Sequence, residues 1–432
     1  MQQEISLAIC GLGTVGNGLL KILRDRQSFE GQKYSVDYIF DRSFAKKQDI
    51  TPKGTKATND ITEFFSWFAK KKPDVVIELV GGIETALVLV REAIEHHIPV
   101  ITANKALMAE HGYSLLSLAS QRKTQVYFEA AIAGALPIVR NLDSLLGYQK
   151  IEKLEGILNG TTNYILTRMR KEKLDYADVL TDAQAKGLAE ADPTLDVSGE
   201  DAVHKLALLA TMVSGKWVDY HKIYFRGITE INGADVEWAN SMNYRIRLIG
   251  KCFQENNEDK LFLSLEPTLI DQNHLLYDVE FENNAVSLQA QFSKDHLFVG
   301  KGAGSFPTAY SVYSDLQALA ANEPLRLQAK TQNHWHYANL ASLENLVQQF
   351  YIRLRVKDQT GVLANISEIF QKNDISLAKV HQDSLNNNSF NKEIDVVLVT
   401  HDAKRGLLLK TLALLQIQNY IVTTPVLLPI DS

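Results

Sequence analysis

The stretch between Ala183 and Lys205 concentrates residues that could do chemistry. Four of its acids, in chain order, are Glu190, Asp192, Asp196 and Asp201. Carboxylates can hold the ammonium group of a substrate, and a neighbouring lysine can exchange a proton with a carbonyl or an alcohol. Asp201 and Lys205 are four residues apart, so a helix places them on the same side. The stretch therefore predicts a polar binding site with a lysine acid or base.

A solvated helix pair is the other interpretation of Asp201 and Lys205. Exposed pairs of this kind usually contribute only a few tenths of a kcal/mol. The apolar residues 206–210 that follow favour partial burial of the pair. Rigid residues in the preceding loop, at Gly187, Pro193 and Gly199, also favour a built site.

A glycine motif follows the first apolar run of the chain, residues 5–10, and opens a helical pattern. It reads Gly11-Leu12-Gly13-Thr14-Val15-Gly16. Its glycines allow a tight turn, close approach of a pyrophosphate and contact between helix and strand. The pyrophosphate then rests on the helix N-terminus. The motif predicts a dinucleotide site, whereas an empty glycine turn is the alternative.

The residues after the second expected strand leave the type of dinucleotide open. An acid there binds the ribose 2′-hydroxyl of NAD, whereas an arginine favours the 2′-phosphate of NADP. Asp41 meets the description for NAD and Arg42 the one for NADP. Lys46 and Lys47 follow them in the chain.

Three further segments have both a chemical and a structural interpretation. Lys105 follows Thr102 at a strand end, where such sheets bind ligands, although a loop lysine is usually a solvated charge. Residues 129–137 could be a hinge rich in glycine and alanine, and residues 156–163 could be a capped turn.

Composition excludes several classes of protein. The 432 residues suffice for two or three domains. A net charge of −6 gives no electrostatic reason to bind nucleic acid or an anionic membrane surface. Two cysteines predict neither a disulfide framework nor a zinc site. No apolar run approaches the roughly 18 residues that span a bilayer, so we expect a cytoplasmic protein.

Alternating strand and helix patterns predict an α/β protein with a doubly wound parallel sheet. This dinucleotide-binding domain is expected over residues 1–140, with a return segment at about 303–330. Residues 141–302 predict an α+β catalytic and dimerisation domain, with alternating strands over residues 226–299. After a polar linker at 331–347, residues 348–432 predict a βαββαβ domain. Its expected strands are 351–356, 376–382, 394–400 and 421–426, and its helices are 362–371 and 404–416.

Residues 183–205 resemble, position by position, the signature of homoserine dehydrogenases. The matching positions are an alanine, a glycine, Asp192-Pro193, Asp196 with a hydrophobic neighbour, Gly199, Asp201 and Lys205. Leu188 departs from the family, which commonly has an aromatic residue there. The segments at 11–16, 101–105, 129–137 and 156–163 also resemble family motifs, so the similarity spans essentially the whole chain.

The resemblance implies reversible, NAD(P)H-dependent reduction of L-aspartate 4-semialdehyde to L-homoserine. It implies that Lys205 is the general acid and base and that Lys105 assists it. Substrate-binding roles are implied for Glu190, Asp201, Gly160 and Thr161, with Asp196 in support. An arginine at the place of Arg42 implies NADP, with NAD possible. Further cofactor contacts are implied for the glycine motif and for Thr102, Lys105 and Gly302.

The resemblance also implies a monovalent cation, expected to be Na⁺. Backbone carbonyls hold it in the family, sometimes with a glutamate, which here implies Glu129, Ile132, Gly134 and Leu136. Oxygen ligands suit a hard cation.

The element order after residue 348 resembles an ACT domain, a small module that senses amino acids. The chain therefore resembles the monofunctional form of the family with a C-terminal ACT domain. A homodimer or homotetramer and threonine as a possible effector are implied.

Two other functions are open to such a chain. One is an oxidoreductase that acts on a different amino-acid aldehyde or alcohol. The other is a non-catalytic sensor of dinucleotide and amino acid. Lys105, Asp201 and Lys205 together favour an enzyme, because sensing needs no proton donor.

Overall fold

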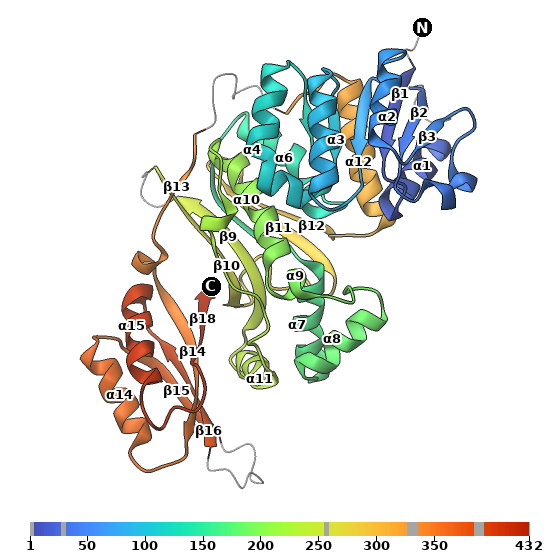
Figure 1. Ribbon diagram of the computed structural model, residues 1–432. Coiled ribbons are helices and arrows are strands. Elements are labelled where there is room, and N and C mark those ends of the chain that lie inside the picture. The colour runs from blue at the N-terminus through green and yellow to red at the C-terminus, as the bar shows by residue number, and fades with distance from the viewer. Residues whose placement is uncertain (1–3, 27–31, 255–258, 326–335, 384–392, 432) are drawn as a thin grey trace. The chain divides into compact units, whose positions relative to one another are not determined.

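The computed structural model describes residues 4–26, 32–254, 259–325, 336–383 and 393–431, which form two compact units. The first unit takes in Met1–Gly160, Asp201–Ile223 and Glu282–Asn339 (Figure 1). The second takes in Thr161–Glu200, Tyr224–Phe281 and Leu340–Ser432. None of the described helices has the length and apolar character to cross a membrane.

The first unit contains a six-stranded sheet in the order β3-β2-β1-β4-β5-β6, and all its neighbours are parallel. This is the strand order of dinucleotide-binding folds, and it confirms the predicted sheet. The short, polar strand β3 was not expected from the sequence. The strands are β1 (Ile5–Cys10), β2 (Tyr34–Phe40), β3 (Lys56–Thr58), β4 (Val75–Glu78), β5 (Val100–Thr102) and β6 (Val126–Tyr127).

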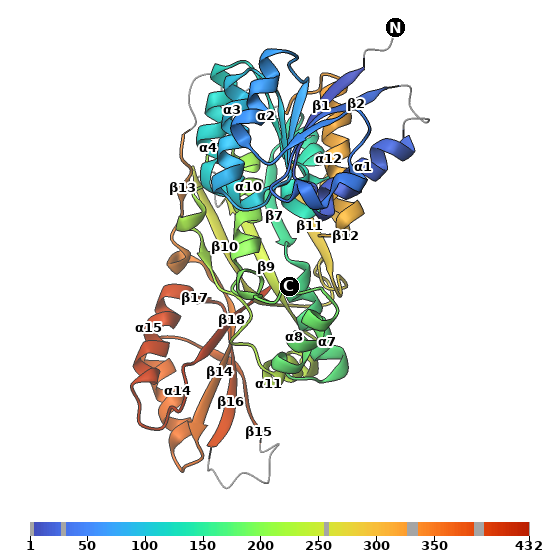
Figure 2. The ribbon, with the colours of Figure 1, turned by 45° about the vertical axis from the view of Figure 1, so that its right-hand side comes forward.

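Helices cover both faces of this sheet (Figure 2). On one face α1 and α12 pack together, and Leu19, Val312 and Leu316 meet Leu7 and Ile9 in one apolar cluster. Since α12 follows nearly 300 residues after α1, the chain returns here to complete the layer. The helices around the sheet are α1 (Thr14–Arg26), α2 (Ile61–Ser66), α3 (Glu84–Glu95), α4 (Lys105–Gln121), α5 (Ala130–Ala133), α6 (Ile138–Leu146) and α12 (Ser305–Ala320).

The rest of the first unit holds three antiparallel strands in the order β12-β11-β7 and a buried helix. Every residue of α10 from Asp201 to Met212 is buried, as expected of a helix with apolar residues on all sides. The fold therefore places Asp201 and Lys205 in the interior. These elements are β7 (Ile151–Ile157), α10 (Glu200–Ser214), β11 (Asn283–Ala290) and β12 (Lys294–Lys301).

The second unit contains a mixed sheet in the order β9-β10-β18-β14-β16-β15. Strands β9 and β10 are antiparallel, whereas β10 and β18 are parallel. Residues 226–299 were expected to alternate as strands, but they include a helix, α11, which begins with an Asn232–Asp235 capping box. Elements before the C-terminal region are α7 (Gly160–Glu172), α8 (Tyr176–Ala185), α9 (Thr194–Val197), β8 (Tyr224–Phe225), α11 (Gly233–Ser241), β9 (Arg245–Gln254), β10 (Lys260–Ile270) and β13 (Asn339–Leu340).

The C-terminal elements follow the order expected from the sequence, apart from their last strand and a two-residue strand, β17. The expected strand at 421–426 is wrong, because Ile421 makes only an isolated bridge with Val356. The apolar residues of Val426–Asp431 pair with both β14 and β10. Of the predicted linker, residues 331–335 lie outside the described part of the chain. The elements are β14 (Val347–Lys357), α14 (Val362–Lys372), β15 (Leu377–Asp383), β16 (Glu393–Thr400), β17 (Ala403–Lys404), α15 (Arg405–Gln416) and β18 (Val426–Asp431).

A buried ion pair joins α11 to β14 within the second unit. Arg353 donates from Nε to Asp235 Oδ1 at 2.7 Å and from Nη2 to Oδ2 at 3.1 Å. Tyr351 donates its hydroxyl to the same carboxylate at 3.0 Å. Asp235 is fully buried, so loss of its charge would leave the guanidinium of Arg353 with only the more distant Asp395, at 4.0 Å, as a counter-charge.

We expect Asp235→Asn to lower the free energy of unfolding by about 3–5 kcal/mol, the usual effect of breaking a buried pair. Urea denaturation followed by circular dichroism measures the change. Glu237→Gln is the matched control, because Glu237 is an exposed acid on the same helix. A loss for Asp235→Asn no larger than that of the control would contradict this account.

Candidate active site

The carboxylate of Asp201 holds two lysine ammonium groups. Lys105 Nζ lies 2.8 Å from Asp201 Oδ1, and Lys205 Nζ lies 2.7 Å from Oδ2. Lys105 is the first residue of α4, and Asn104 caps that helix by accepting from Leu107 N. The predicted pairing of Asp201 with Lys205 is thus present, and the structure adds Lys105 to it.

The turn after β7 completes the surroundings of Asp201. Asn159 Nδ2 donates to Asp201 Oδ2 at 2.9 Å, and Lys205 Nζ donates to Leu158 O at 2.8 Å. Burial alone would raise the pKa of Asp201, but the ammonium groups of Lys205 and Lys105 hold it well below its usual range. Asp201 is therefore ionised at neutral pH. Sequence reasoning gave no role to Asn159, although it stands in the motif at 156–163.

The two lysines differ in exposure. The side chain of Lys205 is 9% exposed, whereas that of Lys105 is 41% exposed. The buried ammonium of Lys205 suits proton exchange with a substrate oxygen that loses its contact with water when the substrate binds. The more exposed ammonium of Lys105 is accessible to a substrate oxygen that it could position.

Close backbone packing explains two of the predicted glycines. A Cβ atom on Gly160 would lie 2.6 Å from Glu282 O, and one on Gly302 would lie 2.3 Å from the Asn284 amide. Asn284 Nδ2 in turn donates to Leu158 O at 3.1 Å. Gly160 and Gly302 therefore allow the chain to approach the turn that contacts Lys205.

The glycine motif has the geometry that a pyrophosphate requires. Gly11 has φ +102°, and a Cβ there would lie 2.5 Å from Leu79 O. A Cβ on Gly16 would lie 2.1 Å from Gly11 O, whereas one on Gly13 would meet nothing within 4 Å. The backbone at Gly13 is thus open to a ligand at the N-terminus of α1, which begins at Thr14. Leu12 and Val15 complete the turn, so the residues fit a dinucleotide.

Thr102 is tied to a buried acid that sequence reasoning missed. Its hydroxyl donates to Glu78 Oε2 at 2.5 Å, and Val80 N donates to Glu78 Oε1 at 2.8 Å. Burial raises the pKa of Glu78 above its ordinary value. Asn104 N donates to the Thr102 hydroxyl at 3.0 Å, so this network supports the start of α4. An acid at the end of an apolar strand was the available sequence signal.

The predicted cation residue Glu129 lies in a second buried cluster. Glu129 Oε1 accepts from Val139 N at 2.8 Å and Oε2 from Arg140 N at 3.0 Å, so the carboxylate caps α6. Asp315, which sequence reasoning missed, accepts from Glu129 N at 2.9 Å and from Arg140 Nη2 at 2.6 Å. Burial, with repulsion from Asp315, raises the pKa of Glu129 to about 8. Burial also raises the pKa of Asp315 to about 6.

The predicted carbonyl ligands of the cation are partly engaged in hydrogen bonds. Gly134 O accepts from the Ser311 hydroxyl, and Leu136 O accepts from Ile138 N at 2.8 Å. Ile132 is buried on the short helix α5, which ends just before Gly134. Because a carbonyl oxygen has two lone pairs, these atoms could still hold a hard cation. The donor type fits the predicted ion, and the Glu129 carboxylate keeps lone pairs beyond its two bonds to α6.

Three predicted substrate residues belong to the second unit. Glu190 is exposed and Asp196 is half-buried. The Thr161 hydroxyl donates to Leu188 O at 2.9 Å, so it steadies the loop that carries Glu190.

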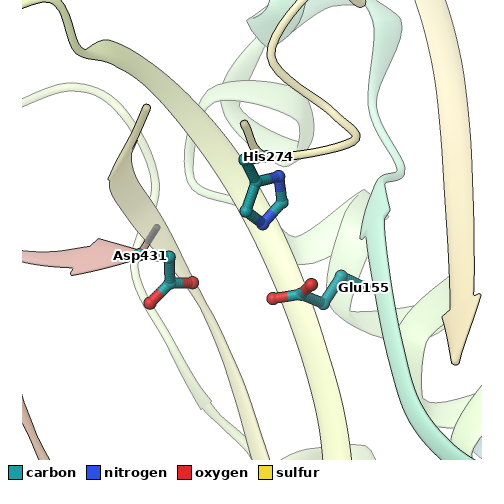
Figure 3. A group of neighbouring side chains, drawn as sticks. All are labelled: Glu155, His274 and Asp431. Atoms are coloured by element: carbon teal, nitrogen blue, oxygen red, sulfur yellow. The ribbon is translucent and has the colours of Figure 1, made fainter. Parts of the chain in front are cut away.

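Figure 3 labels Glu155, His274 and Asp431, and we assign no metal ion to these residues. Glu155 lies on β7, His274 follows β10 and Asp431 ends β18. Each of the two acids forms an ion pair with a lysine of the same compact unit. Lys153 Nζ lies 3.0 Å from Glu155 Oε2, and Lys251 Nζ lies 2.5 Å from Asp431 Oδ2.

Comparison with known proteins agrees with this geometry. A model described as homoserine dehydrogenase matches residues 137–317, and one described as homoserine dehydrogenase, NAD binding domain matches residues 11–129. The homoserine dehydrogenase of Bacillus subtilis (strain 168) is 36% identical over 405 residues, 92% of each chain. The chain belongs to the homoserine dehydrogenase family.

Solved structures of the family resemble all or most of the chain. A homoserine dehydrogenase from Thiobacillus denitrificans has a TM-score of 0.88 at 31% identity, over 100% of this chain and 99% of that one. A hyperthermophilic archaeal homoserine dehydrogenase in complex with NADPH has a TM-score of 0.63 at 25% identity, over 75% of this chain and 99% of that one. The function is that of the family, an oxidoreductase with a nicotinamide dinucleotide cofactor. An oxidoreductase of another kind and a non-catalytic sensor are not favoured.

The raised pKa of Glu129 predicts a pH dependence of stability. Its proton stabilises the folded state fully below the ordinary value of 4.5, and this contribution is lost as the pH rises towards about 8. Between pH 5 and 8 the free energy of unfolding should therefore fall, by about 3 to 4 kcal/mol from this group. Glu129→Gln should remove that part of the fall.

Thermal and urea unfolding in buffers whose only cation is tetramethylammonium would measure the effect. Glu152→Gln, a change at an exposed acid, should keep the wild-type fall. The same fall in Glu129→Gln as in wild type would show that Glu129 does not titrate in this range.

Proposed function

We propose that Lys205 is the general acid and base in the interconversion of L-aspartate 4-semialdehyde and L-homoserine. The observation that carries this proposal is the buried carboxylate of Asp201, which holds Lys205 and Lys105 within 2.8 Å. An ammonium fixed in this way can donate to a carbonyl oxygen as negative charge develops there.

In the reduction, Lys205 Nζ gives a proton to the aldehyde oxygen, and in the oxidation it takes the hydroxyl proton back. When bound, the nicotinamide supplies or accepts the hydride. Lys105 orients the same oxygen and offsets its charge. Asp201 keeps both ammonium groups in place, and Leu158 O fixes the direction of the Lys205 side chain.

We assign the amino-acid part of the substrate to Glu190, Asp201, Thr161 and Gly160, with Asp196 in support. Glu190 is exposed, so its carboxylate is accessible to a substrate. The bond from Thr161 to Leu188 O restrains the loop before Glu190.

NADP is our proposed cofactor, with NAD as the second choice. Arg42 is exposed directly after the buried Asp41, where a guanidinium can pair with a 2′-phosphate. The archaeal relative in complex with NADPH supports this choice. The glycine motif from Gly11 to Gly16 would hold the pyrophosphate, with Thr102, Lys105 and Gly302 as further contacts.

A monovalent cation, expected to be Na⁺, stays a proposal for residues 129–136. The carbonyl oxygens of Ile132, Gly134 and Leu136 would hold it with Glu129, whose carboxylate accepts two backbone hydrogen bonds and keeps lone pairs for a cation. A cation there would offset the repulsion between Glu129 and Asp315.

The three expected domains remain our proposed division, with an ACT domain over residues 348–432. The sheet order β18-β14-β16-β15 with two helices supports it. Gly361 adopts φ +89° and caps α14, which forms a turn after β14 where an amino-acid effector such as threonine could bind. A homodimer or homotetramer and a cytoplasmic location also stay predictions from the sequence.

Lys205→Ala should lower kcat by about 100-fold or more, the usual contribution of a general acid. Steady-state homoserine oxidation measures kcat, and fluorescence titration with NADPH should show little change in cofactor affinity. Lys150→Ala, at an exposed lysine of the same unit, should keep wild-type kcat. Near-native kcat in Lys205→Ala would remove Lys205 from the mechanism.

Asp358 is exposed in the turn between β14 and α14. Asp358→Ala should weaken threonine inhibition at least about tenfold, if the Asp358 carboxylate holds the effector ammonium through a charge-assisted hydrogen bond. Without threonine, kcat should be unchanged. The control is Asp402→Ala, at another exposed acid of the C-terminal region. Equal inhibition of Asp358→Ala and wild type would place the effector elsewhere, and no inhibition of wild type would exclude threonine.

A further inference from the structure

The carboxylate of Asp41 is filled by donors from the chain itself. Asp41 Oδ1 accepts from Ser43 N and from the Ser43 hydroxyl, both at 2.8 Å. Asp41 Oδ2 accepts from Leu12 N at 2.6 Å and from Lys47 Nζ at 2.8 Å. Since a carboxylate has about four lone-pair positions, these donors leave none for a ligand.

The position of Asp41 is the one from which an acid selects NAD. Asp41 follows β2 directly, and an acid at this strand end accepts from the ribose 2′-hydroxyl of NAD. Here the carboxylate instead tethers the glycine motif through Leu12 N. Its negative charge, which would repel a 2′-phosphate, is paired with the ammonium of Lys47.

The local chain path brings Lys47 back over Asp41. Phe44 N donates to Asp41 O at 3.0 Å, and Lys47 N donates to Phe44 O at 2.8 Å around a short 3-10 turn, η1 (Phe44–Lys46). The side chain of Asp41 is 6% exposed and that of Lys47 is 26% exposed. Lys46, one residue earlier, is exposed and belongs to the turn itself.

Asp41 is ionised in this setting. Burial alone would raise its pKa, but the bonds from Lys47, Leu12 N and Ser43 outweigh burial and lower it. The charge on Asp41 is therefore present at neutral pH and would act on a cofactor if its partner were removed.

We propose that Lys47 sets the cofactor preference by masking Asp41. With Lys47 in place, Asp41 serves the glycine motif and Arg42 reads the 2′-phosphate. Without the ammonium, Asp41 Oδ2 gains a free lone pair and an unpaired charge, which favour a ribose 2′-hydroxyl and oppose a 2′-phosphate. This inference rests on the proposed cofactor role of Arg42.

Lys47→Met tests the masking directly. Binding of NADH and NADPH to the full-length protein, without substrate, is measured by cofactor fluorescence. We expect NADH to bind more tightly than in wild type and NADPH to bind more weakly, each by about tenfold or more, as for one charged hydrogen bond. An NADH affinity that stays unchanged or falls would overturn the proposal, because Lys47 would then be only a phosphate contact or a support of the loop.

Two further variants separate masking from other effects. Lys46→Met removes the same charge one residue away and should leave NADH affinity at the wild-type value. Lys47→Arg keeps a cation on Asp41 and should keep the wild-type preference. A gain in NADH affinity in either variant equal to that of Lys47→Met would overturn the proposal, and thermal melting confirms that each variant folds.

The proposed function can fail independently in the same titrations. If wild type bound neither nucleotide, the cofactor assignment itself would fail. If Arg42→Ala weakened NADH and NADPH equally, Arg42 would lose its proposed role, while the NADH result for Lys47→Met would still decide the masking by Lys47.

Discussion

A buried carboxylate between two ammonium groups is the interaction on which the candidate site depends. An ionised Asp201 in the interior is costly unless it is paired and hydrogen-bonded. Lys105, Lys205 and Asn159 supply that pairing from three separate elements. Each lysine is in turn restrained by the carboxylate, so Asp201, Lys105 and Lys205 hold one another in place.

The fold brings these elements together by different means. The buried helix α10 fixes Asp201 and Lys205 one turn apart. Strand β5 ends at Thr102, whose bonds to Glu78 and Asn104 set the start of α4 and therefore the position of Lys105. Close packing at Gly160 and Gly302 leaves room for the turn that bears Leu158 and Asn159. The same carboxyl edge of the parallel sheet carries the glycine motif, as expected of a dinucleotide-binding fold.

Local patterns predicted much of this arrangement. The pairing of Asp201 with Lys205, the helix that opens at the glycine motif and the strands of the parallel sheet all depend on neighbours in sequence, and the structure contains them. Helix α11 was missed although Asn232 and Asp235 carry a capping signal. The last strand was placed too early. Its position at Val426–Asp431 depends on pairing with β14 and β10, which are distant in sequence. Contacts such as Lys105 with Asp201, or Glu129 with Asp315, join residues roughly 100 or more apart, and no local pattern reveals them.

The central claim is that Asp201 acts through the lysines it holds, and a double-mutant cycle tests it most directly. Steady-state kcat for homoserine oxidation would be measured for wild type, Asp201→Asn, Lys205→Ala and the double variant. If the residues act as one unit, the double variant should have a kcat within about threefold of Lys205→Ala. Losses that multiply in the double variant would contradict the account.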